Sequence, residues 1–164
     1  MEEQQSQQLD ELLIPPLNFA VVDRGIYRSG YPNITNLPFL GKRRLKSIIS
    51  IRTTSSSSSA RTRSLFSTSA LMETRREPFV DIPEDVIRLA LKNLLDPGNH
   101  PVLIHCNKGK HRTGCLVGCL RKLQRWSLTA IFDEYRRFAG TKVRMLDQQF
   151  MELFDVSSFR GLTR

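Results

Sequence analysis

The chain has 164 residues, of which 40% are hydrophobic and 25% charged, and this composition supports one globular domain while excluding two large ones. It contains no apolar run near the roughly 18 residues that span a bilayer, and its acidic, polar start is unlike a signal peptide. Three cysteines without a CxxC pair fit neither a disulfide framework nor common zinc sites. We therefore expect a reduced, soluble, cytoplasmic protein, with the nucleus as a second compartment.

The formal net charge of +9 indicates a polyanionic partner but does not distinguish nucleic acid, membrane surface and phosphorylated small molecules. Nucleic acid is disfavoured because no basic stripe with interleaved aromatic residues is present. Residues 1–13 are predicted to form a disordered tail, residues 14–159 a single domain, and residues 160–164 a second short tail. The identity of the partner must come from local motifs.

The first predicted elements are strands. Residues 19–22, a turn at Gly25 and residues 26–29 predict a hairpin, and the β-branched run at 47–51 predicts a buried strand. Residues 51–76 then break the composition, since 13 of these 26 are Ser or Thr and five arginines face one acid. This tract is either a basic or phosphorylatable regulatory loop or a poorly ordered insert, and the second alternative would leave the sheet incomplete.

Helical patterns dominate the second half of the chain. An amphipathic helix is predicted at 83–95, with Pro83 and acidic residues in its first turn, and the turn residues 96–98 end it. A compact apolar strand follows at 101–104, and helical patterns follow at 128–138 and 147–154. This order of elements predicts an α/β domain with a helical C-terminal half.

One motif carries the chemistry. Residues 105–114 read His-Cys-Asn-Lys-Gly-Lys-His-Arg-Thr-Gly and lie between the apolar strand and an apolar helix, where unpaired backbone N–H groups and the helix dipole favour an anion. Cys106 is predicted to be a thiolate nucleophile, and Arg112, six residues later, a bidentate phosphate ligand. The amides and the nearby cations should lower the pKa of Cys106 from its free value of about 8.5. Gly109 would let the backbone approach the ligand, and Thr113 could hydrogen-bond Cys106.

Several residues near Cys106 and Arg112 also allow a purely structural interpretation. Cys115 and Cys119 lie four apart on an apolar helix face and are predicted to be core residues. His105 either orients the nucleophile or hydrogen-bonds backbone. A metal site is disfavoured because lysines separate the potential ligands and no zinc spacing occurs, so we expect no metal and no cofactor. Four basic residues could form an outer rim for a highly charged ligand or be solvated surface charges: Arg136, Arg137, Lys142 and Arg144.

The segment 101–139 closely resembles the plant and fungal atypical dual-specificity phosphatases, as do three shorter segments, 14–19, 27–32 and 77–80. The resemblance implies a cysteine-phosphatase fold, in which helices flank a central, mostly parallel sheet, and a preference for inositol pyrophosphates without a metal. It implies that Cys106 is the nucleophile and that Arg112 binds phosphate. It assigns the rest of the phosphate-binding loop to Asn107, Lys108, Gly109, Lys110, His111 and Thr113.

The chain departs from that family at 51–76, where the relatives have a helix and a second strand that ends in an acidic residue. Leaving-group protonation could use a carboxylate, and Glu73 lies near the position of the family's acidic residue, with Asp81 and Glu77 as alternatives.

Three functions therefore stay open: a phosphatase of inositol pyrophosphates, a phosphatase of phosphoproteins or phosphoinositides, and a catalytically impaired phosphate-binding protein.

Overall fold

The computed structural model describes residues 12–51, 61–63 and 82–162. Its five strands are β1 (Ala20–Asp23), β2 (Ile26–Ser29), β3 (Ser47–Ser50), β4 (Arg61–Arg63) and β5 (Val102–His105). Its α-helices are α1 (Leu37–Gly41), α2 (Glu84–Leu95), α3 (His111–Leu123), α4 (Leu128–Ala139) and α5 (Met145–Leu153). The predicted hairpin, the predicted strand before the motif and the predicted helices are all present, which confirms the α/β class. None of the helices in these described ranges is long and apolar enough to cross a bilayer.

The strands form one sheet in the order β1-β2-β5-β3-β4. β5 lies at its centre and pairs in parallel with β2 on one side and β3 on the other. The pairings of β1 with β2 and of β4 with β3 are antiparallel, so the sheet is parallel at its centre and antiparallel at both edges. All four residues of β5 are buried, as expected for a parallel strand covered on both faces. The carboxyl ends of β2, β5 and β3 consequently share one edge.

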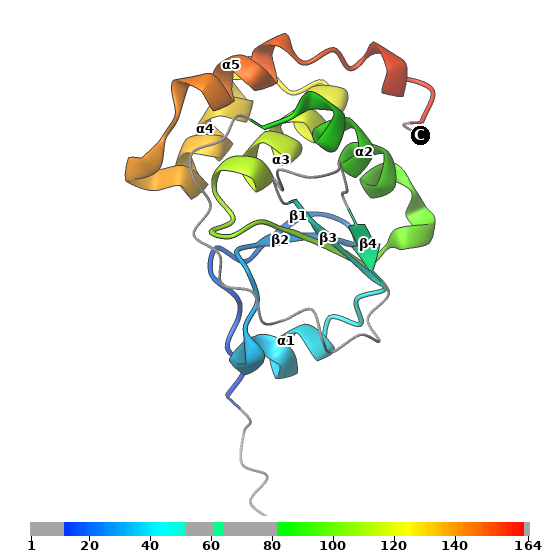
Figure 1. Cartoon of the computed structure of the whole chain (residues 1–164), viewed down its shortest axis with the longest axis vertical. Coiled ribbons are helices and arrows are strands. Elements are labelled where there is room, and N and C mark those ends of the chain that lie inside the picture. The colour runs from blue at the N-terminus through cyan, green and yellow to red at the C-terminus, as the bar shows by residue number, and fades with distance from the viewer. Residues whose placement is uncertain (1–11, 52–60, 64–81, 163–164) are drawn as a thin grey trace, which may run out of the picture.

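Helices cover both faces of this sheet unequally. α1 lies on one face, and α2, α3, α4 and α5 lie on the other (Figure 1). The main core lies between the sheet and the helices of the larger layer, with fully buried residues such as Ile49, Leu91, Ile104 and Leu116. A smaller cluster under α1 is formed by Phe39, Leu40, Leu45 and Leu103. Val102, Leu103 and Ile104 of β5 thus pack into these two clusters and hold the strand at whose end the motif begins.

Three residues of the Ser/Arg-rich tract belong to the sheet. Within it, β4 pairs with β3 from Ile48 to Ser50 and forms the fifth strand. A polar sequence can form such a strand because strand pairing depends on backbone hydrogen bonds. The remaining residues of the tract lie outside the described ranges.

Candidate active site

The site is built where the central strand ends and the longest helix begins. β5 ends at His105 and α3 begins at His111, which leaves five residues for the connection. We call residues 106–112 the phosphate loop. Because β5 is buried and flanked by parallel strands, the loop emerges at the carboxyl edge of the sheet, where open α/β sheets bind ligands.

Three consecutive carbonyl groups of this loop are held by the N-terminal segment of the chain. The backbone N–H of Tyr31 donates to the carbonyl oxygen of Asn107 at 2.9 Å. The side-chain amide of Asn18 donates to the carbonyl of Lys108 at 2.8 Å, and Nη2 of Arg28 donates to the carbonyl of Gly109 at 3.0 Å. The segment around the hairpin therefore fixes the orientation of three successive peptide planes.

This pattern decides where the amides of the loop point. In a trans peptide the C=O of one residue and the N–H of the next are antiparallel. With the carbonyls of residues 107–109 turned toward the hairpin segment, the amides of residues 108–110 face the opposite side. The first turn of α3 adds further N–H groups that have no partner within the helix, together with the positive end of the helix dipole. The loop is therefore an amide-lined cradle suited to a phosphate.

Cys106 and Arg112 lie at the same edge of the sheet. Cys106 follows His105, and Ile51 follows Ser50, the partner of His105 in the β3–β5 pairing. Nη1 of Arg112 donates to the carbonyl of Ile51 at 3.1 Å, which places its guanidinium beside the strand end next to Cys106. Cys106 is 5% exposed and belongs to the main core cluster, so it is buried where β5 ends and does not lie on the open surface. The structure thus brings together the two residues that the motif predicts to act together.

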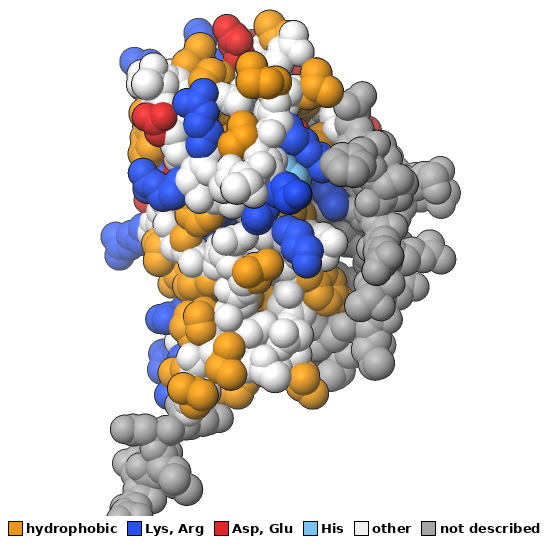
Figure 2. Space-filling view, turned by 90° about the vertical axis from the view of Figure 1, so that its left-hand side faces the viewer, with side chains coloured by type: hydrophobic (Ala, Val, Ile, Leu, Met, Phe, Trp, Pro, Cys, Tyr) orange, Lys and Arg blue, Asp and Glu red, His pale blue; other side chains and the backbone are white. Residues whose placement is uncertain are grey.

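The surroundings of the loop are strongly basic. No acidic residue occurs between Asp96 and Asp133 in the sequence. Lys108 is exposed, and Lys110 and His111 are partly exposed. Figure 2 shows Lys and Arg side chains gathered around a histidine on one face of the protein. An anionic ligand at the loop would meet positive potential on several sides.

A second loop, residues 140–144, is fixed beside the phosphate loop. Nε2 of His111 lies 2.6 Å from the carbonyl oxygen of Lys142, and because a carbonyl only accepts, this nitrogen carries the proton. The N–H of Arg144 donates to the hydroxyl of Tyr135 at 3.2 Å. Lys142 and Arg144 therefore belong to a segment tied to the site, as the predicted basic rim requires. Arg136 instead pairs with Asp133 and Gln148 on the surface of α4.

The structure bears on two predictions for residues of the loop. The Oγ1 of Thr113 is buried and has no hydrogen-bond partner among the described residues, so the expected bond to Cys106 is absent. Gly109 has a φ of +70°, and a Cβ there would lie 2.6 Å from the N of Gly30 and from the C of Ser29. Its lack of a Cβ therefore lets the loop approach the end of β2, and its role of letting the backbone approach the ligand stays a prediction.

Other predictions meet different outcomes. Nδ1 of His105 lies 3.4 Å from the carbonyl oxygen of Cys106, which agrees with the backbone alternative for this residue. Cys115 and Cys119 are fully buried in α3, which confirms them as core residues. Asn107 is exposed at the loop. The candidate general acids Glu73, Glu77 and Asp81 lie outside the described residues.

The motif alone does not identify four residues that contact the phosphate loop on the side of the hairpin: Asn18, Arg28, Gly30 and Tyr31. A Cβ on Gly30 would lie 3.1 Å from the carbonyl oxygen of Asn107, so this residue too allows a close approach. The segment 27–32 resembles the phosphatase family, but nothing in its residue types predicts contact with a loop about 80 positions away. The signal lies in the pairing of β2 with β5, which only the fold provides.

Comparison with known proteins agrees with this geometry. The profile of a family described as the tyrosine phosphatase family matches residues 13–161. An inositol diphosphatase from Oryza sativa subsp. japonica is 56% identical over 155 residues, which cover 92% of this chain and 70% of the relative. A probable tyrosine-protein phosphatase from Dictyostelium discoideum is 50% identical over 146 residues, covering 87% of this chain and 88% of the relative.

A solved structure extends the likeness to three dimensions. It is the core catalytic domain of a PP-IP phosphatase from S. cerevisiae in complex with citrate. It is 41% identical, has a TM-score of 0.76, and the match covers 92% of this chain and 93% of that one. The overall arrangement of sheet and helices described above is therefore that of a known phosphatase core.

Proposed function

Because the chain belongs to the tyrosine phosphatase family, we propose that it is a cysteine phosphatase that hydrolyses inositol pyrophosphates. Cys106 is the nucleophile, and Arg112 together with the amides of the phosphate loop binds the transferred phosphoryl group. The observation that carries the proposal is the fixed orientation of three successive loop carbonyls, which turns the following amides away from the hairpin segment, where they can bind an anion.

The reaction has two displacement steps. In the first, the thiolate of Cys106 attacks the terminal phosphorus, an S–P bond forms, and the P–O bond to the remaining inositol phosphate breaks with the electron pair leaving on that oxygen. In the second, a water attacks the phosphocysteine, the S–P bond breaks, and inorganic phosphate and the thiolate are released, with one proton of the water lost to a base or solvent. The equatorial oxygens of phosphorus stay in contact with Arg112 and the loop amides in both steps.

The substrate class follows from charge. An inositol pyrophosphate carries phosphates around its whole ring, and this chain offers cations from Lys108 and Lys110 in the loop and from the tied segment that contains Lys142 and Arg144. The relative from rice is named an inositol diphosphatase, and the yeast relative of solved structure is a PP-IP phosphatase.

The general acid is the least constrained part of the mechanism. A phosphate leaving group is less basic than an alkoxide and so depends less on protonation by an acid. We propose Glu73 for this role, with Asp81 and Glu77 as alternatives.

A second candidate is a phosphatase of phosphotyrosine in proteins. It is favoured by the description of the matching family and by the name of the Dictyostelium relative. This candidate shares the phosphocysteine chemistry and differs in what surrounds the transferred phosphate.

The two candidates are separated by kcat/KM on a diphosphoinositol phosphate and on a phosphotyrosine peptide, measured as phosphate release. We expect a preference of about tenfold or more for the inositol substrate, because several cations then contribute to binding. Lys142→Met and Arg144→Met should reduce that preference, whereas Lys92→Met, an exposed lysine of α2, serves as the matched control. A preference for the peptide would establish the second candidate.

A further inference from the structure

A buried arginine lies behind the phosphate loop and is not explained by the reaction described above. Arg28 belongs to β2 and is 1% exposed. Its guanidinium carbon lies 3.7 Å from the centre of the Phe138 ring, and its Nη2 donates to the carbonyl of Gly109 at 3.0 Å. Its Nε and Nη1 are buried and have no hydrogen-bond partner among the described residues.

This arrangement is unusual for a buried charge. A guanidinium that leaves water loses strong hydration and is normally compensated by a carboxylate with good hydrogen-bond geometry. The chain contains such a case in Arg121, which makes two hydrogen bonds to Glu134, one to Gln124 and one to the carbonyl of Val22. Arg28 has one hydrogen bond to a carbonyl and an aromatic face instead. Packing alone therefore does not account for a charged residue at this position.

The charges that face Arg28 come from three elements. Burial lowers the pKa of Arg28 to about 10, while the charges of Glu134 on α4 and of Cys106 raise it and that of Arg121 on α3 lowers it. Interaction between two charges is mutual, so the positive charge of Arg28 and a negative charge on the Cys106 sulfur attract each other. In a buried site this attraction is screened much less than on the surface.

We propose that Arg28 is a positioning residue of the phosphate loop, which holds the Gly109 carbonyl away from the ligand and supplies a buried positive charge that favours the thiolate of Cys106. The proposal rests on the proposed function of Cys106 as nucleophile. It gives the loop two arginines with separate tasks. Arg112 is placed to contact the substrate, and Arg28 acts from the opposite side of the loop through the backbone and the sulfur.

The test compares Arg28→Met and Arg28→Lys with Arg121→Met, a matched loss of a buried, ring-stacked arginine that does not contact the loop. Two properties are measured by mass spectrometry of the peptide that contains Cys106. One is the pH profile of its alkylation by iodoacetamide, and the other is its protection by inorganic phosphate. Cys115 and Cys119 serve as internal references because they are buried in α3.

For Arg28→Met we expect the alkylation midpoint to move up by about 0.5 to 1 pH unit and kcat to fall by about 10-fold to 100-fold. Arg28→Lys keeps the positive charge but loses the planar array of guanidinium donors. The alkylation midpoint should therefore be close to that of the native chain, while protection by phosphate should require about fivefold more phosphate than in the native chain. Arg121→Met should lower the melting temperature and leave both profiles unchanged.

Unchanged midpoint and protection in a folded Arg28→Met variant would overturn the proposal. If that variant does not fold, Arg28→Lys decides, since normal phosphate protection in it would overturn the positioning role. The parent function is tested separately by Cys106→Ser. Full turnover by Cys106→Ser would refute the nucleophile, whereas a failed Arg28 test with inactive Cys106→Ser would refute only this inference.

Discussion

At the scale of single residues, Gly109 lies at a close contact between the phosphate loop and the end of β2. Its φ of +70° is a conformation that residues with a Cβ rarely adopt, and the backbone of Ser29 and Gly30 occupies the space where a Cβ would be. The contact involves backbone atoms of a paired strand, which cannot move aside as a flexible side chain could. The shape of the cradle therefore depends on the absence of one methyl group.

Gly109→Ala should displace the loop from β2 and weaken the hydrogen bond from Arg28. We expect the free energy of unfolding to fall by about 1 to 3 kcal/mol from backbone strain, and kcat/KM to fall by about 100-fold because the amides lose their alignment. Urea unfolding and phosphate-release kinetics measure the two effects. Gly41→Ala is the control, since nothing lies within 4 Å of a Cβ at that position. Equal kinetics for the two variants would contradict this role of Gly109.

The residue scale also shows what the sequence can predict about the site. Cys106 and Arg112 are predictable because the motif is local, and its place between an apolar strand and an apolar helix carries the meaning. The contribution of Arg28 is not predictable from the sequence. It depends on the strand register that pairs Arg28 with Ile104, and the two strands lie far apart in the sequence. For Thr113 the motif predicts a contact that the structure does not contain. The residue lies in the same motif as Cys106, but its hydroxyl does not form the expected hydrogen bond to the sulfur.

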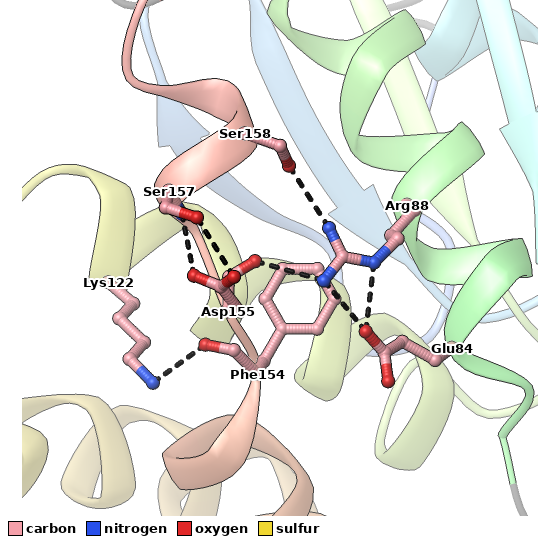
Figure 3. Close-up of polar contacts among 7 residues, drawn as sticks. All are labelled: Glu84, Arg88, Lys122, Phe154, Asp155, Ser157 and Ser158. Atoms are coloured by element: carbon pink, nitrogen blue, oxygen red, sulfur yellow. Dashed lines mark hydrogen bonds and ion pairs between the residues drawn. The ribbon is translucent and has the colours of Figure 1, made fainter.

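At the scale of elements, a C-terminal segment, residues 154–160, is fastened to α2 by one side chain. The guanidinium of Arg88 donates to Glu84, to the carbonyl of Asp155 and to the hydroxyl of Ser158 at 2.8 to 3.1 Å (Figure 3). It also lies 4.8 Å from the centre of the Phe154 ring, and the hydroxyl and N–H of Ser157 donate to Asp155. These contacts cover the end of the core between α2 and α3.

Arg88→Ala should loosen this C-terminal segment without touching the active site. We expect a loss of about 1 to 2 kcal/mol in the free energy of unfolding, because three hydrogen bonds and two cation–π contacts disappear at a partly exposed position. Trypsin should also cleave after Arg160 faster in the variant. Lys92→Ala, exposed on the same helix, is the control. A cleavage rate equal to that of the control would show that Arg88 does not hold the segment.

The elements differ in how visible they are in the sequence. The helix at α2 has an apolar periodicity and acidic residues in its first turn, so it is predictable almost to the residue. β4 is not predictable, because Arg61–Arg63 shows neither alternation nor β-branched enrichment, and its strand conformation depends on pairing with β3. The composition likewise does not predict that both edge strands are antiparallel to their neighbours, because strand direction depends on the path of the chain between the strands.

At the scale of the whole molecule, the interior contains acidic groups that folding keeps protonated. Burial raises the pKa of Cys119 to about 12 and raises the pKa of Cys115 and of Tyr135. Each of these groups releases its proton more readily in the unfolded chain. Above about pH 9 the unfolded state therefore binds fewer protons than the folded state, and stability falls as the pH rises.

The measurement is urea unfolding at pH 8, 9 and 10, a range that ends at the lowered pKa of Arg28. Cys119 alone should contribute about 1 kcal/mol of the loss between pH 9 and pH 10, from its unfolded value of 9.0. Cys119→Ala, although less stable at pH 8 because a buried group is removed, should therefore show a shallower decline than the native chain. Parallel declines would contradict the assignment to Cys119.

The most direct test of the central claim is to trap the phosphorylated enzyme. A diphosphoinositol phosphate labelled in its terminal phosphate is mixed with the protein and quenched in acid within the first turnover, and the label is located by peptide mapping. We predict a phosphorylated peptide that contains Cys106, with label and turnover both lost in Cys106→Ser and both retained in Cys119→Ala. Undiminished phosphate release by Cys106→Ser, with no label on the native chain, would contradict the account.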